Sequence, residues 1–144
     1  MGIELKSKIR IVTVVLLSMV AGCAANGPRY SYSVVADNKQ ADLYVFRPYS
    51  FLSGGLSSGV YIDNEKVGVL KNGGYLSFDV SEGVHQVRVG KSYATIGVKR
   101  ISENYLRYRY GWALFHMVPI VPEVLTEIGK EQALIEINDT KLSR

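Results

Sequence analysis

Residues 75–90, YLSFDVSEGVHQVRVG, carry the clearest sign of the fold class, because two alternating runs of apolar and polar residues flank a turn. The first run places Leu76, Phe78 and Val80 on one face, and the second alternates valines with polar residues. Successive side chains of a β-strand point to opposite faces, so a two-residue period predicts strands that bury one face. The Ser-Glu-Gly sequence between the runs is typical of a turn.

The same succession of short strands and turns continues on both sides of this stretch. Further strands are expected at residues 43–47, 59–63, 66–70, 93–98 and 104–110. Asn64 and Glu65 are expected to form a two-residue hairpin turn, since Asn tolerates a positive φ. Many short strands separated by turns predict a mainly β fold, a small antiparallel β-sandwich over residues 41–144.

The end of the chain departs from this pattern. Residues 112–122, WALFHMVPIVP, are apolar, but their two prolines exclude a regular helix. This segment either completes the core or offers an apolar surface to a partner or a bilayer, and we favour the core because a chain of this size needs its large apolar side chains. A short C-terminal helix is expected from Lys130 to Asn138, with Ala133, Leu134 and Ile137 on one stripe.

Length and charge exclude several function classes. The chain has 144 residues, enough for one domain. Its net charge is +4, but residues 1–22 hold three cations and one anion, so the rest of the chain carries only 14 Lys and Arg against 12 Asp and Glu. That excess is too small to indicate a nucleic-acid partner. Two histidines and a single cysteine do not suggest a zinc site, and we expect no metal and no cofactor.

The first 22 residues have the plan of a secretion signal. Lys6, Lys8 and Arg10 form a positive N-terminal region, and residues 11–20 are an uncharged run. A membrane-spanning helix needs roughly 20 apolar residues, so this run is short for a permanent span. We therefore expect residues 1–22 to be a signal peptide, with a mature chain that begins at residue 23.

The sequence Val20-Ala21-Gly22-Cys23 resembles the lipobox of bacterial lipoproteins. The resemblance implies transfer of a diacylglycerol to the Cys23 thiol and cleavage between Gly22 and Cys23. The alternative is a buried structural cysteine, but Cys23 is the only cysteine and has no partner for an intramolecular disulfide. Ala24 stands where an inner-membrane retention signal of such proteins would have Asp, which implies transport to the outer membrane, with the domain facing the periplasm.

Residues 23–40 are expected to be a lipidated N-terminus and a flexible tether, because Asn26-Gly27-Pro28 breaks regular structure and polar residues follow. The alternative is that Tyr30 to Val35 pairs as an edge strand, which its Tyr and Val content would favour.

Four short motifs resemble a family of small bacterial lipoproteins that carry a domain of unknown function. They are a first strand ending in Tyr-x-Phe-Arg-Pro, an Ile-Asp-x-x-x-Val-Gly hairpin, a Gly-Tyr pair and a Gly-x-His turn, here at residues 44–48, 62–68, 74–75 and 83–85. The last two are also similar to surface β-domains with a Pro-Glu-Gly-Ala turn, although Ser81 replaces the Pro. The family implies a small β-sandwich in the cell envelope and implies no reaction.

Only one side-chain group suggests catalysis. His85 lies near Asp79 and Glu82 in sequence, a candidate acid–base cluster. The alternative, which we favour, is that His85 flanks a turn and bonds backbone groups there. The two hypotheses for function are a non-enzymatic binding or accessory module for an envelope protein partner, which we favour, and an envelope enzyme that acts on glycan or peptide through His85.

The candidate interaction surface combines the apolar segment with nearby cations. It consists of Trp112, Phe115, Met117, Arg107 and Arg109. Arg107 and Arg109 also belong, with Lys99 and Arg100, to a basic concentration that could meet lipid phosphates or an anionic glycan. A solvated sheet face is the simpler interpretation of those charges.

Overall fold

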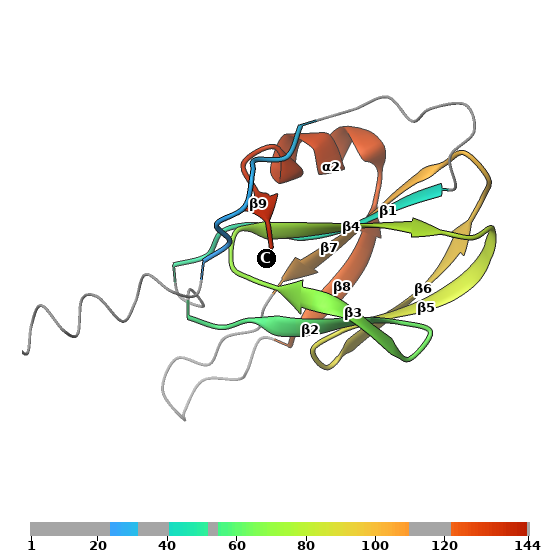
Figure 1. Ribbon diagram of the computed structural model, residues 1–144, viewed down its shortest axis with the longest axis horizontal. Helices are drawn as coiled ribbons and strands as arrows, with labels where there is room; N and C mark the ends of the chain where they lie inside the picture. The colour runs from blue at the N-terminus through green and yellow to red at the C-terminus, as the bar shows by residue number, and fades with distance from the viewer. Residues whose placement is uncertain (1–23, 32–40, 52–54, 110–121, 144) are drawn as a thin grey trace, which may run out of the picture.

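Residues 24–31, 41–51, 55–109 and 122–143 are described by the structure, a computed structural model. Over these residues the chain is mainly β, with two sheets and one short helix, consistent with the predicted β-sandwich (Figure 1). The elements in chain order are β1 (Ala41–Arg47), β2 (Ser58–Ile62), β3 (Glu65–Leu70), β4 (Gly74–Val80), β5 (Gly83–Val89), β6 (Ser92–Val98), β7 (Glu103–Arg109), β8 (Val124–Ile128), α2 (Lys130–Ile137) and β9 (Lys141–Leu142).

The two sheets are built differently. One has five strands in the order β8-β7-β1-β4-β9, and the other has four in the order β3-β2-β5-β6. The four-stranded sheet is antiparallel throughout, but β1 pairs with β7 in parallel, and so does β4 with β9. The five-stranded sheet is therefore mixed, because β1–β4 and β7–β8 are antiparallel, and the prediction of an antiparallel sandwich is wrong only for its two parallel pairs. A parallel pair needs a long crossover connection, and β2 to β6 provide it for β1 and β7.

The main core lies between the sheets. It is built from the inward faces of strands in both, with Leu43, Val45, Val60, Leu70, Val87, Val89, Ile96 and Leu106 almost fully buried. The opposite faces of β1 and β7 are buried as well: Tyr44, Phe46 and Tyr105 pack with Ala133 and Ile137 of α2. The five-stranded sheet is thus covered on both faces where β1 and β7 lie, which explains why residues 43–46 of β1 are apolar on both faces.

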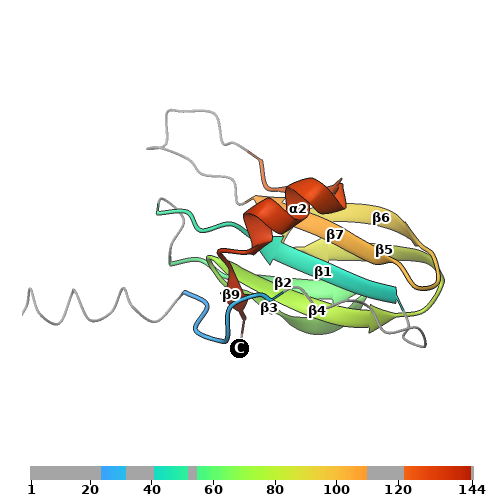
Figure 2. The same ribbon diagram turned by 90° about the horizontal axis from the view of Figure 1, so that it is seen from above.

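The helix predicted near the C-terminus is confirmed. Ala133 and Ile137 are buried and Leu134 packs beside them, which is the predicted stripe. Two ion pairs tie α2 to β7: Arg107 Nη1 lies 2.6 Å from Glu136 Oε1, and Lys130 Nζ lies 2.8 Å from Glu103 Oε2. The helix covers the outer face of the five-stranded sheet (Figure 2).

The β2–β3 hairpin turns one residue earlier than predicted. Its turn residues are Asp63 and Asn64, with φ angles of 49° and 70°, and Glu65 already belongs to β3. Two positive φ angles in succession define the tight turn whose twist suits a hairpin, and short polar side chains tolerate them best. The prediction of Asn64-Glu65 is wrong because the Asp63 carboxylate also accepts a hydrogen bond from the backbone N–H of Gln86, at 2.9 Å, which holds Asp63 in the turn.

Residues 24–31, the described part of the predicted tether, lie along the domain. The backbone N–H of Ala25 donates to Asn72 O at 3.1 Å, and those of Gly27 and Tyr30 donate to Leu142 O and Thr140 O at 3.0 Å. The buried ring of Tyr30 meets Tyr44 and Tyr75 edge-on. An aromatic ring buried in this way fixes the segment that carries it. Residues 32–40 lie outside the described residues.

Candidate functional site

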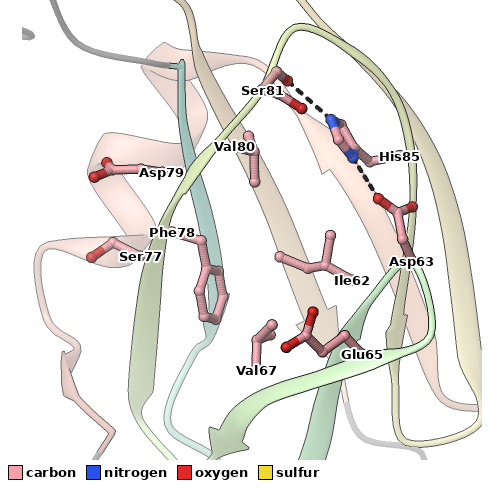
Figure 3. Close-up of a pocket in the computed structure, with 10 residues that line it drawn as sticks. All are labelled: Ile62, Asp63, Glu65, Val67, Ser77, Phe78, Asp79, Val80, Ser81 and His85. Carbon is pink, nitrogen blue, oxygen red and sulfur yellow. Dashed lines mark hydrogen bonds and ion pairs between the residues drawn. The ribbon is translucent and has the colours of Figure 1, made fainter.

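A cavity of about 460 Å³ opens between the β2–β3 hairpin of one sheet and β4 of the other. Ile62 and Val67 point into it from the hairpin side, and Phe78 and Val80 from β4 (Figure 3). Ser77 and Asp79 alternate with the β4 pair and point away from its centre, as the period of a strand requires. The cavity is therefore lined by four apolar side chains together with polar and charged residues.

Two strand edges meet at this cavity. β3 is the outer strand of its sheet, and β4 is paired with β9 only at Gly74 and Tyr75. Over the described part of the chain, Leu76 to Val80 thus have no strand partner on the side away from β1. Unpaired strand edges present a row of backbone donors and acceptors, to which another extended chain can add.

His85 closes one end of the cavity. Its Nδ1 lies 2.7 Å from Asp63 Oδ2, and its Nε2 lies 2.9 Å from the backbone carbonyl oxygen of Ser81 (Figure 3). Both partners are acceptors only, so both ring nitrogens donate and the imidazolium form satisfies the geometry. The hydrogen bond to Asp63 raises the pKa of His85 above its usual value, and the same bond lowers the pKa of Asp63.

The structure corrects the predicted acid–base cluster. His85 is joined to Asp63, 22 residues away in sequence, and not to Asp79 or Glu82. Asp79 points to the other face of β4, and Glu82 is exposed in the β4–β5 connection. The expectation that His85 bonds the backbone of its turn is confirmed by the contact with Ser81. A ring with both nitrogens donating has no lone pair that could accept a proton from a substrate. In this arrangement His85 joins the β4–β5 connection to the β2–β3 turn through its two hydrogen bonds.

The charge at the cavity is negative. The lining includes Asp63, Glu65 and Asp79 and no Lys or Arg. His85 offsets the charge of Asp63 and Asp79 points away from the centre, so Glu65 supplies the negative charge that faces the cavity. In Figure 3 the Glu65 carboxylate lies beside Ile62 and Val67, on the cavity side of β3. A ligand with a cationic group would meet an opposite charge here.

A second polar cluster lies on the outer face of the five-stranded sheet, and the sequence did not reveal it. Register places Asp42 of β1 between Asp79 of β4 and Glu103 of β7. Beside this row Tyr44 stacks on Tyr105, with ring centroids 5.1 Å apart. Burial, followed by the nearby carboxylates, raises the pKa of Tyr44 far above its usual range, so its hydroxyl keeps its proton. The only sequence signal is the Asp-x-Tyr spacing of β1, which is common in strands.

The predicted interaction surface is divided by the structure. The Arg107 side chain is only 15% exposed because it lies under α2, paired with Glu136. Arg109 is exposed at the end of β7, whereas Lys99 and Arg100 lie beyond the end of β6, at the opposite end of the sandwich. The prediction of one basic concentration is therefore wrong, because residues close in sequence lie on opposite ends of a strand. Trp112, Phe115 and Met117 lie outside the described residues.

The predicted lipidation site, Val20 to Cys23, also lies outside the described residues. Within the described ranges, no helix has the length and apolar character needed to cross a bilayer. The same ranges contain no group of three or more His, Cys, Asp or Glu residues that could hold a metal ion. Comparison with protein-family models, curated proteins and solved structures finds no match.

Proposed function

We propose that the protein is a lipoprotein of the bacterial envelope, anchored through a lipid on Cys23, whose β-domain is a non-enzymatic binding module. The signal plan of residues 1–22 and the lipobox-like sequence before the only cysteine support the anchor. Ala24 after the cysteine favours the outer membrane, with the domain facing the periplasm. Several acyl chains on one cysteine would make release from the membrane slow.

The cavity between β3 and β4 carries the binding part of the proposal. Its four apolar side chains suit one or two apolar side chains of a partner, and Glu65 suits a cation. The edges of β3 and β4 that have no strand partner within the described chain suit an extended backbone. The occupant with all three properties is an extended segment of an envelope protein that carries Lys or Arg beside apolar residues. The volume lies within the range of natural ligand sites.

The enzymatic alternative requires a different state of His85 at the same cavity. An envelope enzyme that uses His85 on glycan or peptide needs one ring nitrogen free to accept a proton. His85 donates from both nitrogens, to Asp63 and to Ser81, and would first have to release one partner. The two acceptors that flank the ring are the single observation that favours binding over catalysis.

The anchor is tested by metabolic labelling with a clickable fatty acid. The wild-type chain should be labelled, and Cys23→Ser should remain unlabelled and unprocessed, because the thiol is the acceptor of the lipid. Equal labelling of the two proteins would end the lipoprotein proposal.

The cavity is tested by crosslinking and recovery of partners from cells that express the full chain. Glu65→Lys places a cation at the cavity, where it repels a cationic partner, so recovery should fall by about tenfold or more. Glu127→Lys is the matched control, since Glu127 is exposed on β8, away from the cavity. Equal recovery from both variants would exclude the cavity as the partner site.

A further inference from the structure

Residue 24 is fixed to one end of the sandwich by backbone contacts. Ala24 forms a bridge with Asn72, and the N–H of Ala25 donates to Asn72 O. Adjacent Cα atoms are about 3.8 Å apart, so any group on Cys23 begins within a few ångströms of this end. Residues 24–31, β9 and the chain that follows β1 lie together there in both views (Figures 1 and 2).

Two large aromatic side chains are exposed at the same end. Tyr49 and Phe51 lie in the connection after β1, and they are 67% and 86% exposed to solvent. The connection is not loose beside them: the N–H of Ser50 donates to Asn72 Oδ1 at 2.9 Å, and Asn72 Nδ2 donates to Ser50 O at 3.0 Å. The buried Asn72 therefore holds both the start of the described chain and the loop that carries the aromatics.

Cations surround this end. Strand register brings together the β3–β4 turn, the β5–β6 turn, the end of β7 and the start of β9. Their charged residues include Lys71, Lys91, Arg109 and Lys141, with Glu123 and Asp139 as acids. At the opposite end, the turns of β2–β3, β4–β5 and β6–β7 carry Asp63 and Glu82 as well as Lys99 and Arg100. The end near residue 24 is thus the one with an excess of positive charge.

We propose that this end, formed by Tyr49, Phe51 and the surrounding cations, is the surface that the domain rests on the bilayer. In the anchored protein, Tyr49 enters the interfacial layer, where an aromatic ring with one polar edge is favoured, and the apolar ring of Phe51 leaves water beside it. The lysines and Arg109 meet lipid phosphates. This orientation rests on the proposed lipid at Cys23, and it turns the cavity with His85 toward the periplasm, where a partner can reach it.

Two features of the chain make the bilayer a better occupant than a protein. Tyr49 and Ala24 line the same hollow in the surface, so a lipid on Cys23 would hold the membrane close to this patch. The charge of the patch also matches the anionic headgroups of phosphatidylglycerol. A protein partner would have to share the same narrow space with the anchor.

The orientation is tested with lipidated full-length protein in vesicles of phosphatidylethanolamine and phosphatidylglycerol that contain brominated lipids. The only tryptophan, Trp112, is first replaced by Phe. Phe51→Trp then places a fluorophore at the proposed surface. Val84→Trp is the matched control, because Val84 is also exposed but lies on β5 near the opposite end. Both sites are exposed, so neither substitution disturbs the core.

Bromines placed near the headgroups should quench the Phe51→Trp variant several-fold more than the Val84→Trp variant. Equal quenching, or stronger quenching of Val84→Trp, would overturn the orientation. The anchor is measured separately: fatty-acid labelling of the same proteins shows whether the lipid is present. Labelled protein without selective quenching would refute this inference alone, whereas unlabelled protein would refute the proposed function.

Discussion

Replacement of Tyr30 by Ala should free residues 24–31 from the domain. The Tyr30 ring is buried and meets Tyr44 and Tyr75 edge-on, at centroid distances of 5.6 and 5.4 Å. A buried aromatic side chain removes about 150–250 Å² from water, which at about 25 cal/mol per Å² stabilises the folded state by about 4–6 kcal/mol. The segment can detach instead of leaving a cavity, so the loss should be smaller, about 3 kcal/mol.

The assay is urea unfolding of a chain that begins at Ala24, together with digestion by trypsin. Arg29 is exposed, but the next N–H, that of Tyr30, donates to Thr140 O, so cleavage after Arg29 should be slow in the wild type and fast in Tyr30→Ala. Tyr30→Phe is the control: the Tyr30 and Tyr105 hydroxyls are 3.5 Å apart, and loss of so long a bond should cost less than about 1 kcal/mol. If Tyr30→Ala matched the wild type in both assays, residues 24–31 would not be part of the folded domain, and the proposed membrane orientation would lose its basis.

Three further predictions concern local features. The pKa of His85 is raised, so its bond to Asp63 stabilises the folded state fully below the usual pKa of 6.5, and this stabilisation is lost as the pH rises through the raised value. The pKa of Asp63 is lowered, so protonation of Asp63 weakens the bond only at acid pH. The melting temperature of His85→Gln should therefore fall below that of the wild type most at about pH 5.5, and a constant gap up to about pH 9 would contradict a stabilising bond to Asp63. Ile101, half-exposed with a φ of 53°, occupies a left-handed conformation that costs a β-branched residue roughly 1–2 kcal/mol, so Ile101→Gly should raise the melting temperature by a few degrees; a decrease would show that its side chain stabilises the turn. Glu136→Gln leaves the mostly buried Arg107 without its anionic partner and should cost about 1–2 kcal/mol in urea unfolding, whereas an unchanged midpoint would mean that the pair does not hold α2 to β7.

Much of the candidate site could not be predicted from the sequence. His85 can be singled out from the sequence, but its partner Asp63 lies in the β2–β3 turn, and no local spacing connects the two. The cavity exists because β3 and β4 belong to different sheets and both leave an edge without a strand partner within the described chain. The carboxylate of Glu65 reaches it only because the hairpin turns at Asp63 and Asn64, which shifts Glu65 into β3.

The sequence by itself predicted the strands from β1 to β7 and the buried face of β4. The alternation of Leu76, Phe78 and Val80, and the stripe of Ala133 and Ile137, follow from backbone geometry that is local, so a few neighbouring residues contain the whole signal. The sequence also contains the signal plan and the single cysteine, which depend on order along the chain and not on folding.

Only the tertiary structure decided which strands pair. β4 and β5 are separated by two residues, the spacing of a hairpin, yet they lie in different sheets. Gly83, the first residue of β5, has a φ of 146°. β1 pairs in parallel with β7, whose residues lie 61 positions later in the chain, as in the pair Val45 and Leu106. β8 and β9 were not predicted at all, because the five residues of β8 do not alternate clearly and the two residues of β9 are too few to show a period. Pairing depends on how distant apolar faces fit around one core, and that fit is a property of the whole chain rather than of any segment.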